Sequence, residues 1–320
     1  FAKVANSNRI SLEKNWVTEY VNLNAQTNSD KHKNRCRDIL PEQAHRAKLK
    51  CEKQTCGSYI NAVLVPSLTR TRQDILTQLP LPSTVTDFWR LVTQDNIGLV
   101  VALQEEATRF DETVGQFLPP SDTEVLKDEL FEIKSKQLEE RPLWREVDVT
   151  VHTNKRKSST DSRIDPHNVK CLVCKNTRSD PELVFDLLEK VKSCRPTNRP
   201  RTVYMCRDGA EYSGLLCVQS ILLDRLKTDH FLAVPLVVGP IKAVRPQVIP
   251  TVDQYKCLYD VIKLVHNSAQ NCAYMNVQIY SRPDGPRPGV SKESATHNWP
   301  RLKSNELSLP RVRHTKMSSQ

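Results

Sequence analysis

Hydrophobic positions along the chain fall into short continuous runs separated by longer stretches of helical spacing. A continuous apolar run of about four to eight residues, bounded by turn residues, is typical of a buried strand. Looser alternation over 130–151 predicts two strands of mixed exposure. The continuous runs predict strands at 58–65 (SYINAVLV, followed by Pro66), 97–103 (IGLVVAL), 169–174 (VKCLVC) and 202–205 (TVYM).

Apolar residues spaced three and four apart predict helices between these strands. Ser83 or Thr86 is expected to cap one of them. Pro181 stands in the first turn of another, where a missing N–H costs nothing. Alternating strands and helices predict an α/β domain over 1–280. The predicted helices are SLEKNWVTEYVNL within 1–30, FWRLVTQ, PELVFDLLEKVKSC, SGLLCVQSILLDRLKT and QYKCLYDVIKLVHNS.

Two stretches lack any periodic pattern. Residues 152–168 have almost no apolar content and predict an exposed loop. Residues 281–320 are rich in proline, serine and charge, which predicts a disordered C-terminal tail.

Membrane-spanning segments are not predicted in this chain. The run 231–244 is shorter than the roughly 18 apolar residues that a span requires, and Pro235 and Pro240 interrupt it. The chain begins with Phe1 and not with methionine, so we expect it to be a piece of a longer protein, and the lack of a membrane-spanning segment here says nothing about the whole.

Charge and cysteine content narrow the functional classes. Lys and Arg number 47 against 37 acidic residues, a formal charge of +10. These basic residues are spread along the chain without interleaved aromatics, so no nucleic-acid partner is expected. Ten cysteines without a secretory signal predict free thiols in a reducing compartment. Cys171 and Cys174 form a lone C-x-x-C without a second pair, so we expect neither a metal nor another cofactor.

Candidate chemistry lies in VYMCRDGAEYSGLL, residues 203–216. Cys206 ends a predicted strand, and a short loop leads into a helix. A helix N-terminus stabilises a thiolate, and its free backbone N–H groups can cradle an anion. Asp208 and Glu211, however, place two carboxylates in the loop that would receive the anion. The stretch is either an active site or the remnant of one.

Five segments, in this order, resemble the conserved blocks of protein-tyrosine phosphatases. The resemblance covers about residues 10–280 and implies the fold of that family, a highly twisted mixed sheet flanked by helices. The segments are KNRCRDILP (33–41), YINAVLV (59–65), QLPLPSTVTDFWRLV (78–92), RTVYMCRDGAEYSG (201–214) and IPTVDQYKCLYDVI (249–262).

The resemblance also implies a mechanism. The cysteine attacks phosphotyrosine, and an arginine six residues later holds two phosphate oxygens. An aspartate on a Trp-Pro-Asp loop protonates the leaving oxygen. A glutamine then positions the water that releases the phosphate. Cys206 keeps the nucleophile position, and Ser213, Gly214 and Gln254 are retained.

Most other positions of that mechanism are altered. Arg207, Asp208, Gly209, Ala210 and Glu211 form the remnant phosphate loop, in which Glu211 replaces a usual glycine. No Trp-Pro-Asp stands where the family has it, and Asp180 is the nearest acid. The remaining replacements are Tyr212 for the arginine, Met205 for a histidine, Cys36 for the aromatic that stacks on phosphotyrosine, Thr113 for a lysine and Pro250 for the first glutamine of the Gln-loop.

These losses act on one transition state. An absent arginine forfeits two charge-assisted hydrogen bonds of about 1.5–3 kcal/mol each. An absent proton donor costs about 10²–10⁴-fold in rate. We therefore expect a pseudophosphatase, in which Tyr212 fills the vacated pocket by packing.

Receptor-type phosphatases often carry two such domains, of which the membrane-distal one is commonly degenerate. The resemblance thus implies a D2-like second domain of a single-pass receptor, on the cytoplasmic side of the plasma membrane. Its expected partners are the adjacent catalytic domain and signalling proteins.

Two other functions stay open at this point. One is a residual or specialised cysteine phosphatase that uses Cys206, Asp180 and another cation. The other is a domain that binds phosphotyrosine without hydrolysing it. Cys206 is either an inert thiol or a redox sensor.

Overall fold

The computed structural model describes residues 28–50, 57–67, 73–104, 111–154, 165–175, 181–199, 201–228 and 233–280, with the side chains of 268–280 left undescribed. The predicted N-terminal helix, Asp180 and the predicted tail 281–320 lie outside these residues. A short 3-10 helix, η1 (Asn28–Lys33), opens the described part.

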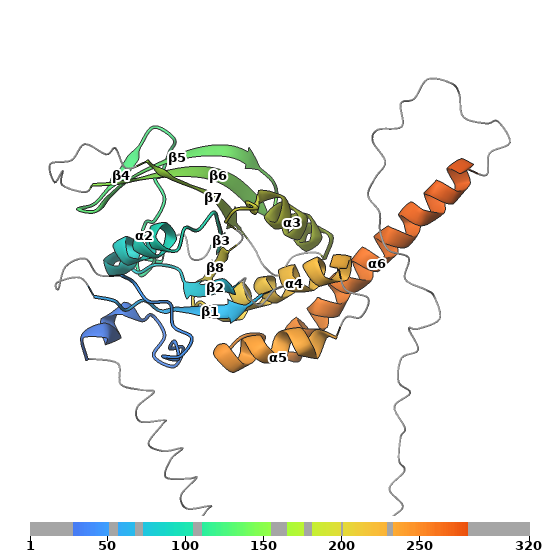
Figure 1. Ribbon diagram of the computed structural model, residues 1–320, viewed down its shortest axis with the longest axis horizontal. Coiled ribbons are helices and arrows are strands. Elements are labelled where there is room, and N and C mark those ends of the chain that lie inside the picture. The colour runs from blue at the N-terminus through green and yellow to red at the C-terminus, as the bar shows by residue number, and fades with distance from the viewer. Residues whose placement is uncertain are drawn as a thin grey trace, which may run out of the picture.

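An eight-stranded mixed sheet forms the centre of the described part (Figure 1). Its strand order is β1-β2-β8-β3-β7-β6-β5-β4. β2, β8, β3 and β7 run parallel, and the remaining neighbours pair antiparallel. The strands are β1 (Ala62–Pro66), β2 (Gln73–Gln78), β3 (Leu99–Leu103), β4 (Val125–Lys127), β5 (Phe131–Glu140), β6 (Trp144–Thr153), β7 (His167–Cys174) and β8 (Thr202–Cys206).

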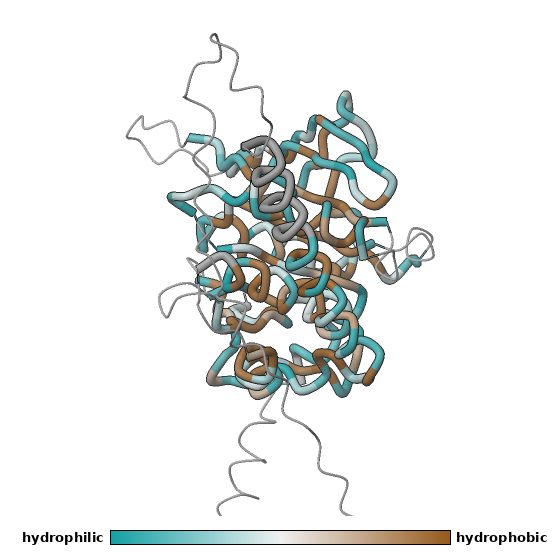
Figure 2. The backbone as a smooth tube through the Cα atoms, turned by 90° about the vertical axis from the view of Figure 1, so that its right-hand side faces the viewer, coloured by the Kyte–Doolittle hydropathy of each residue, from teal (hydrophilic) through white to brown (hydrophobic). Residues whose placement is uncertain are grey.

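Helices cover both faces of this sheet (Figure 1). One face packs on α2 and on the segment around Phe117, and the other packs on the remaining helices. Figure 2 shows hydrophobic residues gathered in the interior between these layers. The mixed, helix-flanked sheet confirms the predicted fold class. The helices are η2 (Pro82–Thr84), α2 (Val85–Gln94), α3 (Pro181–Cys194), α4 (Glu211–Thr228), α5 (Val234–Val244) and α6 (Val252–Tyr280).

Besides the two short 3-10 helices, two strands and one α-helix were not predicted from the sequence. β2 escapes because its core positions include polar side chains: Asp74 is fully buried and accepts hydrogen bonds from the Thr202 N–H (3.0 Å) and the Ser67 hydroxyl (2.7 Å). β4 is a three-residue edge strand with little burial. α5 contains Pro240 within a helix, a residue that ordinarily argues against one.

Two local predictions are wrong. Thr84, and neither Ser83 nor Thr86, occupies the N-cap of α2. The Thr84 hydroxyl accepts the Leu81 N–H (2.8 Å), while the Thr86 hydroxyl donates to Asp128 (2.7 Å). The predicted loop 152–168 is also shorter than expected, because β6 extends to Thr153 and β7 begins at His167.

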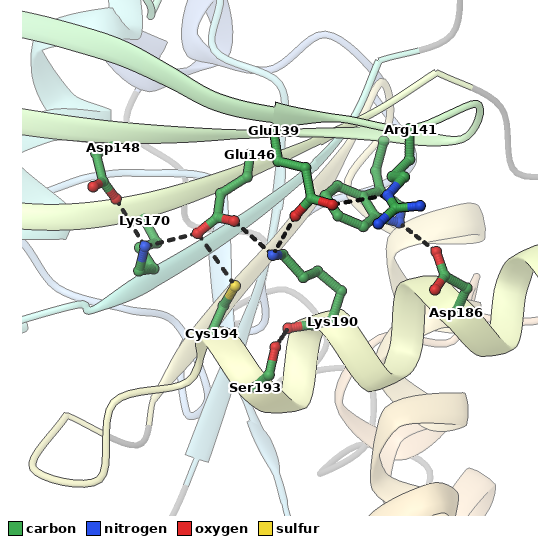
Figure 3. A network of polar contacts seen from close by, with 10 residues as sticks. Glu139, Arg141, Glu146, Asp148, Lys170, Asp186, Lys190, Ser193 and Cys194 are labelled. Carbon is green, nitrogen blue, oxygen red and sulfur yellow. Dashed lines mark hydrogen bonds and ion pairs between the residues drawn. The ribbon is translucent and has the colours of Figure 1, made fainter.

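α3 is held on the sheet by a polar network that Figure 3 shows from close by. Lys190 of α3 donates to Glu146 (2.6 Å) and Glu139 (2.9 Å), and its ammonium lies 4.9 Å from the centre of the Trp144 ring. Lys170 of β7 donates to the other oxygen of Glu146 at 2.7 Å. The network thus joins α3 to β5, β6 and β7.

The two cysteines of the C-x-x-C lie on opposite faces of β7. Cys171 packs with the α2 side of the core and Cys174 with the α3 side. The two thiols therefore do not face a common site. Among the described residues, no helix is long and apolar enough to cross a membrane.

Candidate functional site

The loop between β8 and α4 folds tightly against the end of β2. Cys206 ends β8, α4 begins at Glu211, and only four residues connect them. Gly209 adopts φ +74°, and a Cβ there would lie 2.3 Å from the backbone nitrogen of Gln78. Only glycine meets both conditions, because left-handed backbone and contact with a neighbouring main chain each disfavour a side chain.

Asp208 turns its carboxylate back into this loop. Its Oδ1 accepts the backbone N–H of Ala210 (3.0 Å) and of Glu211 (3.2 Å), and it lies 2.9 Å from the Cys206 Sγ. These two N–H groups stand at the start of α4, where a helix has unsatisfied donors and favours negative charge. The anion cradle that the sequence predicts is therefore formed, and a carboxylate of the same loop occupies it.

Cys206 is held as a neutral thiol. The residue is 2% exposed, and its Sγ lies 3.1 Å from the Ser213 hydroxyl. Burial, together with the adjacent Asp208 carboxylate, raises the thiol pKa to about 12. The thiol proton is donated to Asp208, so the group that should attack phosphorus is protonated at neutral pH.

Glu211 behaves differently from Asp208. Its Oε1 accepts a hydrogen bond from the Gln254 side-chain nitrogen at 2.7 Å. The buried Oε1 of Gln254 has no hydrogen-bond partner among the described residues. The amide that the family resemblance assigns to water positioning is thus engaged by Glu211, and only one of the two loop acids lies in the cradle.

Tyr212 lies at the position where the family resemblance implies an arginine. It is partly buried and packs against the core cluster on the α4 side of the sheet. This placement agrees with a packing role. Pro250, the replacement in the Gln-loop, is exposed.

Arg35, in the predicted phosphotyrosine-recognition segment, is hydrogen-bonded to the loop. Its guanidinium donates to the carbonyls of Arg207 (2.6 Å), Leu79 (2.8 Å) and Thr113 (2.8 Å). The neighbouring Cys36 is partly buried, and burial together with the charge of Asp208 raises its pKa. The segment around Cys36 therefore lies beside the remnant phosphate loop, as the resemblance implies.

Arg207 turns away from the cradle. Its Nε donates to Asp111 at 2.8 Å, and its side chain is 51% exposed. Asp111 also accepts from the hydroxyl and backbone N–H of Thr113, and these bonds, followed by Arg207, hold its pKa at about 2. The arginine next to the nucleophile is thus bound elsewhere.

Arg245 is a site residue that the sequence analysis did not identify. It is completely buried and donates from Nη2 to Asn61 at 3.0 Å. Its Nε and Nη1 find no hydrogen-bond partner in the described part of the chain. Burial lowers its pKa to about 10, while the nearby Tyr59, Cys206 and Asp208 act in the opposite direction. The sequence does not single it out, because the mainly apolar stretch IKAVRPQVI holds a second basic residue, Lys242, which is only partly buried.

Most of the predicted site residues therefore lie together, whereas Pro250 is exposed and the Arg207 side chain is paired with Asp111. The structure gathers Cys36, the loop 206–214 and Gln254 around one cradle. Asp180 lies outside the described residues. The acid step of the family mechanism consequently has no assigned group here.

Comparison with known proteins agrees with this arrangement. The family model described as "Protein-tyrosine phosphatase" matches residues 30–263. The chain belongs to the protein-tyrosine phosphatase family. That span contains the mixed sheet and every described site residue discussed above.

Curated relatives include receptor-type phosphatases. Receptor-type tyrosine-protein phosphatase C of Mus musculus is 24% identical over 82% of this chain and 22% of its own length. Receptor-type tyrosine-protein phosphatase alpha of Mus musculus is 26% identical over 72% of this chain and 28% of its own length. The match thus spans less than a third of either relative.

A solved structure reported under the words "Structural basis of PTPN18 fingerprint on distinct HER2 tyrosine phosphorylation sites" shares the fold. It has a TM-score of 0.67 at 22% identity and covers 81% of this chain and 92% of that chain. At this identity the likeness extends to the fold alone.

Proposed function

We propose that this domain is a catalytically inactive tyrosine-phosphatase-like module that serves regulation and protein interaction in a receptor-type phosphatase. The observation that carries the proposal is the contact between Cys206 and Asp208, 2.9 Å from sulfur to oxygen. One carboxylate holds the nucleophile protonated and also accepts the two N–H groups that should bind phosphate.

The chemistry of phosphotyrosine hydrolysis needs more than a cysteine. A thiolate must form, the cradle must be free for the phosphoryl oxygens, and a cation must neutralise them. Here the thiol pKa is about 12, Asp208 fills the cradle, and Tyr212 offers no positive charge. Each loss separately raises the barrier for the same step, so the losses compound.

The names of the receptor-type relatives support a proposal for the location and the partners. We place the domain as the membrane-distal, D2-like second domain of a single-pass receptor, on the cytoplasmic side of the plasma membrane. Its partners are then the adjacent catalytic domain and signalling proteins. Support for this comes from the receptor-type names of the relatives and from the degenerate phosphate loop.

The first prediction concerns hydrolysis. A phosphotyrosine peptide incubated with the purified chain should release no phosphate above the rate of a Cys206→Ser control, because the thiol is protonated and the cradle is filled. Phosphate release is measured over hours at near-neutral pH. A rate that disappears in Cys206→Ser would support the competing function, a residual cysteine-dependent phosphatase.

A further inference from the structure

The loop between β8 and α4 keeps the form of an anion cradle, and the Asp208 carboxylate of the same loop occupies it. We propose that the Asp208 carboxylate is a built-in ligand of an oxyanion site that remains formed, and that removing this carboxylate lets the site take a small tetrahedral oxyanion such as inorganic phosphate. The inference rests on the proposed function, since it explains why a cradle that is formed does not bind and hydrolyse phosphotyrosine in the natural chain.

The hydrogen bonds of Asp208 give the first argument. One oxygen, Oδ1, receives the N–H of Ala210, the N–H of Glu211 and the thiol of Cys206 at 2.9–3.2 Å. Three donors that converge on one oxygen define a position for an anionic oxygen. Removal of the carboxylate leaves the two N–H groups without this acceptor, which is unfavourable for partly buried donors. A tetrahedral oxyanion restores such an acceptor.

Arg245 gives an independent argument. Its guanidinium is completely buried, and two of its three nitrogens lack a hydrogen-bond partner in the part of the chain that the structure describes. Asp208 is the nearby carboxylate of the loop whose charge acts on it. A buried cation without a close counter-ion favours negative charge beside it. The surroundings of the cradle are therefore suited to an anion even though Tyr212 supplies no charge.

A comparison of Glu211 with Asp208 distinguishes two ways in which these acids could exclude an anion, by occupying the cradle or by repelling negative charge. Asp208 and Glu211 carry the same charge in one short loop, but the Glu211 carboxylate lies against the Gln254 amide at 2.7 Å. If Asp208 acts as an occupant, neutralising Asp208 opens the site and neutralising Glu211 does not. If the acids act only by repulsion, both changes have similar effects. Glu211→Gln is thus a matched control for Asp208→Asn.

The experiment uses the full chain and follows alkylation of Cys206. Iodoacetate and iodoacetamide react identically: a sulfur–carbon bond forms, the carbon–iodine bond breaks, iodide leaves and the thiol proton passes to the buffer. Only iodoacetate is an anion, so a faster alkylation of Cys206 by iodoacetate than by iodoacetamide indicates an open anion site beside the sulfur. Because the chain has ten cysteines, the rate is read on the Cys206 peptide by mass spectrometry. Inorganic phosphate is the competing ligand, and circular dichroism confirms folding of each variant.

In Asp208→Ala we expect iodoacetate to modify Cys206 about tenfold or more faster than in the natural chain, and millimolar phosphate to slow this reaction. Asp208→Asn keeps an acceptor oxygen and hence the fold, and it should change in the same direction by a smaller factor. The natural chain and Glu211→Gln should react slowly and without any effect of phosphate.

Equal gains in Glu211→Gln and Asp208→Asn would overturn the inference, and so would folded Asp208 variants that show neither iodoacetate preference nor protection by phosphate. Those results leave the proposed function intact, because they concern the variants alone. The proposed function fails separately, through Cys206-dependent hydrolysis by the natural chain.

Discussion

Two glycines of this chain differ sharply in what their backbone and surroundings permit. Gly209 combines φ +74° with a main-chain neighbour 2.3 Å from the position of a Cβ. Gly239, within α5, has nothing within 4 Å of that position. The same chemical change should therefore act in opposite directions at these residues.

We expect Gly209→Ala to lower the free energy of unfolding by about 3 kcal/mol or more. The left-handed backbone costs an alanine about 1–2 kcal/mol, and overlap with Gln78 adds about 1–3 kcal/mol. Gly239→Ala is the control and should raise stability by at most about 0.5 kcal/mol, because the better helix propensity of alanine is partly offset by Pro240, which disfavours a Cβ on the preceding helical residue. Urea titration measures both. A Gly209→Ala variant as stable as the natural chain would show that the loop can move away from β2.

At the scale of elements, α3 depends on charge as well as on apolar packing. Glu146 on β6 has a side chain only 8% exposed, and it is bonded to both Lys170 and Lys190 (Figure 3). Burial alone would raise the pKa of Glu146, but the bonds from the two lysines outweigh burial and leave it lowered. A carboxyl with a lowered pKa stabilises the fold at neutral pH and loses this effect as acid protonates it.

Glu146→Gln should therefore cost about 2–3 kcal/mol at pH 7, because a charged hydrogen-bond partner of two lysines is removed. The difference from the natural chain should begin to shrink as the pH falls below about 4.5, where the unfolded chain takes up the proton, and should vanish only below the lowered pKa of Glu146 in the folded chain. Thermal unfolding from pH 7 to pH 3 follows this.

Glu132→Gln is the control for this prediction. Glu132 pairs with Lys127 and Lys134, whose side chains are 63% and 53% exposed, so Glu132→Gln should change stability far less than Glu146→Gln does. A pH-independent effect of Glu146→Gln would contradict the charge argument.

Across the whole molecule, Arg195 connects three elements on one side of the sheet. It follows the last residue of α3 and donates to Asp224 of α4 (2.8 Å), Thr202 of β8 (3.2 Å) and Ser220 of α4 (3.1 Å). The side chains of Arg195 and Asp224 are 9% and 8% exposed. Burial by itself lowers the pKa of Arg195, but the surrounding acidic groups leave it raised, so the arginine stays charged.

Arg195→Met should lower the free energy of unfolding by about 3–5 kcal/mol, because it leaves the Asp224 carboxylate buried without its cation. The double variant Arg195→Met, Asp224→Leu should be clearly more stable than Arg195→Met, since neither charge then remains. Chemical denaturation of the natural chain, both single variants and the double variant gives the coupling. Additive effects would show that the two side chains do not act as a pair.

The sequence alone was enough to predict the fold and most of the positions at which the chain departs from the phosphatase motifs. Continuous apolar runs marked β1, β3, β7 and β8 because strands buried on both faces carry few polar residues. Five family blocks in the right order placed Cys206 and showed that the arginine position holds tyrosine. The type of residue at each position of a family motif can be read from the sequence without coordinates. β2 was missed because the partners of its buried Asp74, Thr202 of β8 and Ser67 directly after β1, come close to it only after folding.

Only the tertiary structure decided what the two loop acids do. In the sequence, Asp208 and Glu211 are simply two acidic residues of one loop. In the structure, the Asp208 carboxylate accepts two backbone N–H groups and a thiol, while the Glu211 carboxylate accepts the Gln254 amide. The side chain of Arg245 gave no hint that it would be buried with two unpaired nitrogens near that loop. Hydrogen bonds form only between groups that the fold brings within about 3 Å of each other, and the order of residues along the chain does not specify which groups these are.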